Sequence, residues 1–534
     1  MTSQQLSVSS FNNLLITLLR NSSIYLPQSI PAIAIITAGA AIILTTGASW
    51  RYILSRKQTY FSTIPTPKGS LPLVGHLFSL GRNRVETFHQ WHKELGSIFY
   101  FRLGVKKMLV VADPWAAHEL LATMGKITSN RPKTTSRPMF GDVRGIIFAQ
   151  PHEMTWSILR KSALNALGPR KLKEASPILN KEADEFVELV ATGVNIVPLP
   201  LLMRSSLNFI FLTVFSVRTT SIEDPIYKTA ISIINTSMKF SDFKNLASQF
   251  IPLLRIFDPI IGIKKKIIAY HKSMTIPFYI ELIERALDAE EKNMVKILND
   301  KLNHGKRGYY DNLIATIHDM AVAGTDTTAV TMAWSFLQLS TKLEVQMKIQ
   351  HEIDTFVNNN GRLPNFWERN EMPYLIATQR ECMRLRPTTE FGVIHASAED
   401  FEWHGSVIPK DTWIMTNMAD IHSDTEKYPE PEQFIPERFL GREESMTASA
   451  NRKTEDRDQF NFGWGRRVCI GSHLAETQMF NVWVRVLHRC IIRPALDKNG
   501  NEVPQSLQTV PPEAGPIVVS PSKFELRFVP RNSV

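Results

Sequence analysis

The sequence predicts a mainly α-helical fold with small β-sheets at one side, preceded by one N-terminal transmembrane helix. Three observations support this prediction. Long helical patterns dominate after about residue 150, short β-rich runs occur at 96–114 and 391–417, and the run Ile30–Trp50 is apolar and uncharged. The composition, 43% hydrophobic and 21% charged over 534 residues, is globular. We find no internal repeat and no strong mid-chain linker, so we expect one large domain.

The uncharged run, residues 30–50, is long enough to span a bilayer, which takes roughly 20 apolar residues. Basic residues follow it at Arg51, Arg56 and Lys57, whereas only Arg20 precedes it. The positive-inside rule then places residues 1–29 outside the cytosol as a tail, with a sequon at Asn21, and the rest of the chain in the cytosol. A cleaved signal peptide is the alternative. It would need a basic start, which residues 1–10 lack, so a retained anchor is favoured.

Residues 51–75 are basic and then proline-rich, which predicts a stiff linker to a main domain at 76–534. The first elements of that domain are two β-rich runs between Gly96 and Pro114, joined by a Gly-Val-Lys-Lys turn, and they predict a hairpin. Helical patterns follow at about 152–168, 171–192, 199–215, 225–240, 264–303 in pieces, and 311–342. Short strands are expected within 391–417, irregular chain at 420–460, and a helix after Cys469.

One helical stretch, Phe250 to Lys266, is apolar and then basic. It predicts either a second membrane contact, with its lysines at the headgroups, or an ordinary helix pair that packs on the core. The sequence leaves both possibilities open.

The net charge of +10 suits an anionic membrane surface or an acidic protein partner. Nucleic acid is not expected, because the basic residues are scattered and no nucleic-acid motif occurs. Three cysteines do not make a disulfide framework and fit a reducing compartment.

Cys469 stands in the stretch "FNFGWGRRVCIG", among arginines and glycines. A thiolate, not a thiol, is the metal ligand, and it benefits from nearby positive charge and free backbone N–H groups. Arg466 and Arg467 supply charge. Glycines also let the backbone approach a flat ligand closely; they are Gly463, Gly465 and Gly471.

Three alternatives compete for this cysteine. It can be a buried structural residue, the commonest role of a lone cysteine. A zinc site from Cys469, His473, His488 and Cys490 is disfavoured, because His-x-Cys is an awkward spacing for one tetrahedral site. A catalytic nucleophile is disfavoured because no general base is evident beside it.

The pattern F-x-x-G-x-R-x-C-x-G is filled at every fixed position by Phe462, Gly465, Arg467, Cys469 and Gly471. This loop resembles the haem-binding loop of the cytochrome P-450 superfamily, the haem-thiolate monooxygenases. The resemblance implies that Cys469 is the axial ligand of a haem b iron, that Phe462 packs beside the sulfur and that Arg467 pairs with a haem propionate. A thiolate ligand favours O–O cleavage.

"AGTDTT", from Ala323 to Thr328, lies inside an apolar helical run and resembles the oxygen-binding groove of that family. Ala323 and Thr327 share a helix face, and a mid-helix glycine, Gly324, costs about 1 kcal/mol against alanine. The resemblance implies that Ala323 and Gly324 leave room over the iron, and that Asp326 and Thr327 relay protons to bound dioxygen. Alternatively, Thr327 only bonds back to the preceding turn of a core helix.

Two further patterns extend the resemblance. Glu381, Arg384 and Arg438, in "ECMR" and "PERF", resemble a buried structural triad. "WSILR" and "GVIHAS" resemble positions that hold the haem propionates, which implies cofactor binding by Trp156, Arg160 and His395. Alternatively, His395 is a strand histidine exposed to water. The resemblance covers about Pro65 to the C-terminus, in full motif order, in the style of microsomal, fungal members.

The resemblance therefore implies a monooxygenase that inserts one atom of O2 into a small apolar substrate. NADPH would supply electrons through a separate NADPH–cytochrome reductase, with cytochrome b5 as a second candidate donor. The chain carries no dinucleotide fingerprint or flavin domain of its own, and a basic face around Arg466 could dock an acidic reductase. A single-pass protein of the endoplasmic reticulum membrane with a cytosolic catalytic domain is expected, with secondary metabolism as its setting.

Two rival functions remain: a haem-thiolate isomerase or dehydratase that acts without O2, and a non-catalytic haem-binding protein. The acid–alcohol pair Asp326 and Thr327 argues against the first, and the intact oxygen-binding groove argues against the second. By the resemblance, the segments that contact substrate in this family would contribute a largely apolar cavity wall. Its residues here would be Phe140, Ile146, Phe148, Met320, Val322, Phe391 and Val393. A steroid, terpenoid, fatty acid, polyketide or xenobiotic would fit, and the sequence does not choose among them.

Overall fold

The computed structural model describes residues 60–531, except for 82, 135–144, 242, 303–308, 443 and 516. The expected tail, the expected transmembrane helix and most of the linker lie outside the described residues. Within them, one helix is long and apolar enough to cross a membrane, α9 (Pro198–Phe215), and 67% of it is buried inside the protein. Because most of α9 is buried and it packs along α16 (Tyr309–Leu339) and α8 (Ser176–Val190), it is a core helix.

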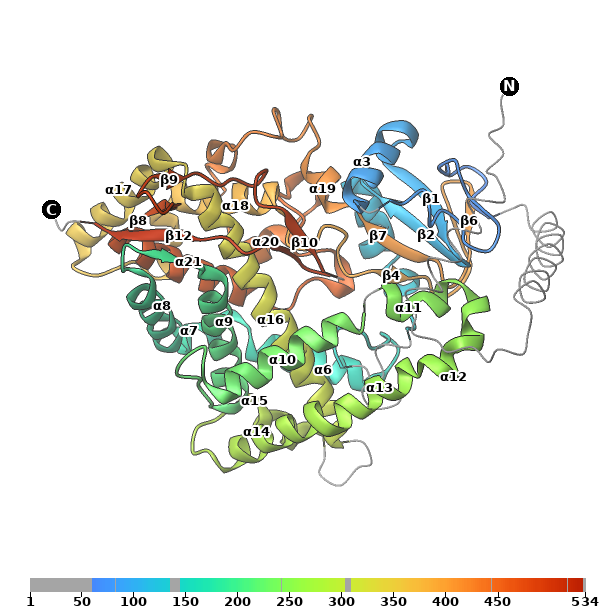
Figure 1. The fold of residues 1–534 in the computed structure, drawn as a ribbon, viewed down its shortest axis with the longest axis horizontal. Coiled ribbons are helices and arrows are strands. Elements are labelled where there is room, and N and C mark those ends of the chain that lie inside the picture. The colour runs from blue at the N-terminus through green and yellow to red at the C-terminus, as the bar shows by residue number, and fades with distance from the viewer. Residues whose placement is uncertain are drawn as a thin grey trace. The chain divides into compact units, whose positions relative to one another are not determined.

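Helices dominate the structure, as predicted (Figure 1). The predicted helix at 171–192 is two helices, since Pro177 begins a new one. The main helices are α3 (Arg84–Leu95), α6 (Met154–Ala166), α7 (Pro169–Glu174), α8 (Ser176–Val190), α9, α10 (Pro225–Lys239), α11 (Phe243–Phe250), α13 (Ile263–Tyr270), α14 (Ile276–Asp288), α15 (Met294–Leu302), α16 (Tyr309–Leu339), α17 (Leu343–Asn360), α18 (Pro373–Leu385) and α21 (Ser472–Arg489).

Small sheets are present, but the prediction that they lie at one side of the helices is wrong: Figure 1 shows the first sheet at the right and the C-terminal sheet at the left. The predicted hairpin is confirmed. β1 (Ile98–Leu103) pairs antiparallel with β2 (Lys106–Val111), which pairs parallel with β7 (Trp413–Thr416); β4 (His395–Ala396) completes the order β1-β2-β7-β4. β5 (Phe401–Trp403) and β6 (Ser406–Ile408) form a second hairpin. The C-terminal strands form one sheet in the order β3 (Asn195–Ile196), β12 (Leu526–Pro530), β8 (Cys490–Leu496), β9 (Glu502–Val503), and β10 (Pro512–Ala514) pairs with β11 (Val519–Pro521).

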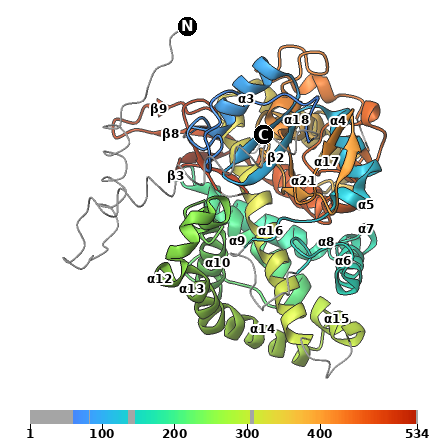
Figure 2. The same cartoon turned by 90° about the vertical axis from the view of Figure 1, so that its right-hand side faces the viewer.

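Helix α16 is the central element. Figures 1 and 2 both place it between helices α18 and α21 on one side and α10, α13 and α14 on the other. It is 31 residues long, so it spans roughly 46 Å at 1.5 Å per residue. It packs along α9, and the close approach has a local cause: a side chain on Gly324 would collide with Ile210 of α9. Gly324 is thus explained by helix packing.

The predicted structural triad is confirmed in geometry. Arg384 forms two hydrogen bonds to the carboxylate of Glu381, at 2.7 and 2.8 Å, and Arg438 lies 3.3 Å from the same carboxylate. The Glu381 side chain is fully buried. This network of charged side chains links α18 to the short 3-10 helix η5 (Pro436–Phe439), which contains Arg438. Removing one member would leave a buried charge unpaired.

The segment after α11 does not pack on the core. Within η2 (Pro252–Phe257) and α12 (Asp258–Ile261), Ile256 is 64% exposed and Ile260 is 73% exposed. The alternative of an ordinary core helix pair is therefore wrong for these residues. Leu253, Phe257 and Ile261 are exposed beside them, and three exposed lysines follow at 264–266.

Candidate active site

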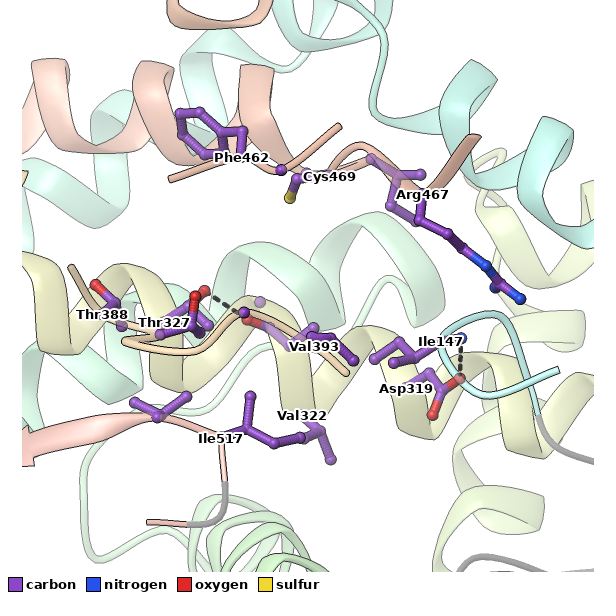
Figure 3. Close-up of a pocket in the computed structure, with 18 of the residues that line it drawn as sticks. Ile147, Asp319, Val322, Thr327, Thr388, Val393, Phe462, Arg467, Cys469 and Ile517 are labelled. Atoms are coloured by element: carbon purple, nitrogen blue, oxygen red, sulfur yellow. Dashed lines mark hydrogen bonds between the residues drawn. The ribbon is translucent and has the colours of Figure 1, made fainter. Parts of the chain in front are cut away.

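A cavity of about 360 Å³ lies between the Cys469 loop and α16. Figure 3 shows the sulfur of Cys469 pointing into this space from the loop, with Thr327 on the helix that faces it. Most of the wall is apolar, and it includes Ile146, Phe148, Met320, Val322 and Val393, as predicted. A cavity of this size and character suits a small organic ligand.

Two of the predicted wall residues lie elsewhere. Phe140 falls outside the described residues. Phe391 is not part of the cavity wall, because its ring packs against Phe88 at a centroid distance of 5.0 Å in the core beside the β1-β2-β7-β4 sheet.

The Cys469 loop is held by short backbone contacts. Its turn η7 (Gly465–Arg467) precedes Cys469, whose backbone N–H donates to the carbonyl of Phe462 at 2.9 Å. Gly465 has a φ of +57°, and a Cβ there would collide with the backbone of Leu121 and Ala122, so only glycine fits. Gly471 has ordinary φ; a Cβ there would lie 3.9 Å from the Cys469 Sγ. Its lack of a side chain leaves the sulfur uncovered.

The Cys469 thiol faces the interior cavity, which explains why its surface is open although it lies inside the fold. Burial raises the thiol pKa, while the backbone N–H groups of Gly471 and Ser472, at the start of α21, and the charge of Arg160 act in the opposite direction. These groups are the ones that stabilise a thiolate, the ionised form that a metal binds.

Among the described residues, no three His, Cys, Asp or Glu side chains gather to hold a metal ion. The described chain therefore gives no support to the zinc alternative at Cys469, His473, His488 and Cys490. One uncovered thiol in such a cavity fits a metal that brings most of its own ligands, as haem iron does.

Cationic side chains line one end of the cavity. Arg467 is buried and donates to the carbonyls of Ser129, at 3.0 Å, and Ile146, at 3.2 Å. Burial, together with the charges of Arg160 and Arg466, lowers the pKa of Arg467 to about 9. Arg160 donates to the carbonyl of Val468 at 2.6 Å, and burial lowers its pKa too. Buried cations this close favour an anionic ligand, and the two propionates of haem meet that requirement.

Trp156 and His395 complete this end. Trp156 does not line the cavity: its Nε1–H donates to the carbonyl of Ile146 at 3.0 Å, and its ring lies 4.6 Å from the guanidinium carbon of Arg467. It thus supports Arg467 from behind. His395 lines the cavity, and its Nδ1 contacts the carbonyl of Thr128 at 3.0 Å. It is buried, so the alternative of a strand histidine exposed to water is wrong, and burial lowers its pKa.

On α16, Ala323, Gly324, Asp326 and Thr327 all line the cavity. Thr327 donates its hydroxyl to the carbonyl of Ala323 at 2.7 Å, the back-bond that the alternative interpretation describes. The Asp326 Oδ1 atom is buried and has no hydrogen-bond partner among the described residues, and burial raises the Asp326 pKa to about 6. An acid with a pKa near neutrality can both hold and release a proton under cellular conditions.

The sequence reasoning missed two charged residues of the site. Arg131 lines the cavity and donates to the carbonyl of Ile147 at 3.1 Å and to that of Ile394 at 2.9 Å. Asp319 accepts the backbone N–H of Ile147 at 2.8 Å, as Figure 3 shows. A signal existed for Asp319, because it precedes Ala323 by one turn and Thr327 by about two turns. Arg131 stands in no recognisable pattern.

The segment 145–149 thereby links the cofactor side to α16. Its carbonyls accept from Arg131, Arg467 and Trp156, while Asp319 holds its N–H group. Gly145, with φ of +62°, permits this approach, since a Cβ there would collide with Asp319 and the backbone of α16. The wall residues Ile146 to Phe148 are thus positioned by both sides of the cavity.

Comparison with known proteins agrees with this geometry. The family model Cytochrome P450 matches residues 65–518. Cytochrome P450 monooxygenase fogE of Aspergillus ruber is 30% identical, over 93% of this chain and 92% of its own length. The 3-hydroxyphenylacetate 6-hydroxylase of Emericella nidulans is 26% identical, over 88% and 89%. The steroid 17-alpha-hydroxylase/17,20 lyase of Bison bison is 29% identical, over 80% and 86%.

The matched region contains the Cys469 loop, the α16 groove and the buried triad in one continuous alignment. The residues that face the cavity fit haem, and the relatives are named monooxygenases and hydroxylases. The chain belongs to the cytochrome P450 family, the monooxygenases with cysteine-ligated haem iron, which require O2, an electron-transfer partner and an organic substrate.

Proposed function

We propose that this chain is a membrane-anchored haem-thiolate monooxygenase that inserts one oxygen atom of O2 into an apolar organic substrate, with electrons from NADPH through a separate reductase. The observation that best supports this proposal is the position of Cys469: its thiol opens into an apolar cavity across from Thr327. Asp326 lines the same cavity. Haem b, when bound, supplies the iron at which O2 is reduced.

Cys469 would hold the iron as its thiolate, and the start of α21 stabilises that charge. The haem propionates would be bound and oriented by Arg467, Arg160, Arg131 and His395. Contacts of these side chains with backbone carbonyls would then be replaced by hydrogen bonds to the propionate carboxylates. Phe462, Gly465 and Gly471 shape the loop, and Ala323 and Gly324 form the part of α16 that faces it. Trp156 positions Arg467.

Asp326 would take up protons and pass them through Thr327 into the cavity. Its pKa of about 6 suits this role, since the carboxyl is neither fixed in its ionised form nor fixed in its protonated form. The hydroxyl of Thr327, now on the carbonyl of Ala323, needs only a rotation about its χ1 bond to meet another acceptor. An isomerase or dehydratase that acts without O2 has no need of this pair.

The exposed apolar segment 252–261 with its following lysines supports a second contact with the membrane, beside the expected anchor. The positive-inside rule supports a catalytic domain in the cytosol, and the resemblance to microsomal members supports the endoplasmic reticulum membrane as its location. The exposed Arg466, behind the Cys469 loop, is our candidate for docking an acidic reductase, or cytochrome b5 in its place.

The test is the carbon-monoxide difference spectrum of the reduced, full-length protein in membranes. A strongly red-shifted Soret band establishes thiolate-ligated haem. NADPH consumption that depends on O2, the reductase and an added substrate then establishes monooxygenase activity. A Soret band at the ordinary position, or no haem, contradicts the assignment of Cys469. A thiolate band without O2-dependent turnover would favour the isomerase or the non-catalytic haem protein.

A further inference from the structure

The cavity wall also includes a group of polar residues. Four residues form it, which we call the distal recess: Ser237 of α10, Ser241 just after α10, His271 of η3 (His271–Thr275) and His318 of α16. All four line the same cavity as Cys469 and Thr327, although none belongs to the motifs of the Cys469 loop or the α16 groove. These polar residues can therefore bind a polar group of a ligand, unlike the apolar wall.

The two histidines are the centre of the recess. His271 is 4% exposed and His318 is 6% exposed, and their rings meet edge to face at 6.3 Å between centroids. Each Nδ1 has a partner: Thr275 Oγ1 at 3.0 Å for His271, and the Tyr279 hydroxyl at 3.3 Å for His318. Neither Nε2 has a hydrogen-bond partner within the described part of the chain, so two ring nitrogens remain available in the cavity wall.

Both histidines are neutral at physiological pH. Burial lowers the pKa of His271 to about 4 and that of His318 to about 3, and the nearby His271 further opposes protonation of His318. A neutral imidazole offers one donor or one acceptor at Nε2. The recess thus provides hydrogen bonds without a charge.

Ser237 adds an unsatisfied group. Its Oγ atom is buried and has no hydrogen-bond partner among the described residues. An unpaired buried hydroxyl costs about 1–3 kcal/mol, so a ligand that reaches it is favoured.

A pure hydrocarbon would leave these three groups unpaired, and a carboxylate would bring a charge to rings that burial keeps neutral. A neutral oxygen function satisfies all three groups. We propose that the distal recess binds a neutral hydroxyl or carbonyl group at the far end of the substrate, and thereby selects apolar alcohols, phenols or ketones. This inference rests on the proposed monooxygenase function.

The recess also indicates the length of the substrate. His318 precedes Thr327 by nine residues on α16, which separates them by roughly 13 Å along the helix axis. A molecule anchored in the recess and oxidised beside Thr327 is therefore elongated.

The test uses full-length holoprotein and the spin-state change that ligands cause in its absorption spectrum. Two matched series serve as probes: dodecan-1-ol, tridecane and dodecanoate, and 4-hydroxybiphenyl, 4-methylbiphenyl and biphenyl-4-carboxylate. Within each series the size is nearly constant and only the end group changes. We expect the hydroxylated member of at least one series to bind about tenfold more tightly than its hydrocarbon partner, the worth of one buried hydrogen bond.

Variants assign the preference to the recess. Ser237→Ala and His318→Phe should each reduce it at least about threefold, whereas His318→Gln, which keeps an N–H donor, should retain most of it. Met238→Leu, which changes shape at the same wall without touching a hydrogen bond, is the matched control and should keep the preference. Ser237→Ala removes one atom only, so it carries the test if His318→Phe does not fold.

Every preparation is first checked for the carbon-monoxide band, which separates the two claims. A missing band in the wild type contradicts the proposed function itself. With the band present, three results overturn the inference: equal or undetectable binding of the hydroxylated members, tightest binding of the carboxylates, or a preference that survives Ser237→Ala and His318→Phe together.

Discussion

Replacing Asp326 with asparagine is expected to stabilise the folded protein at alkaline pH. The carboxyl is buried with one oxygen unpaired, and burial raises its pKa from the ordinary 3.8 to about 6. Each pKa unit corresponds to about 1.4 kcal/mol, so the ionised carboxyl costs the folded state up to about 3 kcal/mol. Asparagine cannot ionise and escapes that cost.

The sign follows from the linkage between protonation and folding. Between pH 4 and 6 the unfolded chain gives up this proton while the folded chain keeps it, so the stability of the wild type falls as pH rises. The cost is absent below about pH 3, about half developed at pH 5 and complete above about pH 7. The advantage of Asp326→Asn should therefore be about 1.5 kcal/mol at pH 5 and about 3 kcal/mol at pH 8.

The assay is urea unfolding of the detergent-solubilised holoprotein at pH 5 and pH 8, followed by loss of the thiolate Soret band and by far-ultraviolet circular dichroism. Glu344→Gln, at an exposed carboxyl near the start of α17, is the matched control and should change stability by less than about 0.5 kcal/mol at either pH. An Asp326→Asn variant that is no more stable than the wild type at pH 8, or equally stabilised at both values, would refute the reasoning.

Four other predictions follow from the site and the fold. Cys469→Ala should lose the red-shifted carbon-monoxide band, and a surviving band would mean that another residue binds the iron. Thr327→Ala should keep haem but release reduced oxygen as hydrogen peroxide; unchanged coupling of NADPH to product removes Thr327 from proton delivery. Glu381→Gln should destabilise the domain by about 3–5 kcal/mol in urea unfolding, since it leaves two buried arginines without their carboxylate, and a loss below about 1 kcal/mol contradicts that role. In lipid nanodiscs, a fluorescent label on Ile260→Cys should be quenched by brominated lipid, whereas the same label on Met347→Cys, exposed on α17, should not; equal quenching argues against membrane contact at α12.

Local patterns allowed much of the site to be predicted. The Cys469 loop, the α16 groove and the buried triad each consist of residues only a few positions apart, or of two such pieces in a set order. Backbone geometry at that range is decided by the residues themselves: Gly465 needs its left-handed conformation, and Ala323 and Thr327 share a face in any helix. The mainly helical fold and the β1-β2 hairpin followed from periodicity for the same reason.

Contacts between residues that lie far apart along the chain could not be predicted from the sequence. The sequence alone established the family resemblance, the iron-ligand candidate and the acid–alcohol pair. Only the tertiary structure shows that Trp156 packs on Arg467 and that Phe391 packs in the core against Phe88. It also shows that Ile210 lies against Gly324. It alone brought His271 and His318 together with Ser237, because three helices distant in sequence converge there. Burial shifts the pKa values of those histidines and of Asp326. Because burial results from the packing of distant segments, no single stretch of the sequence predicts these shifts.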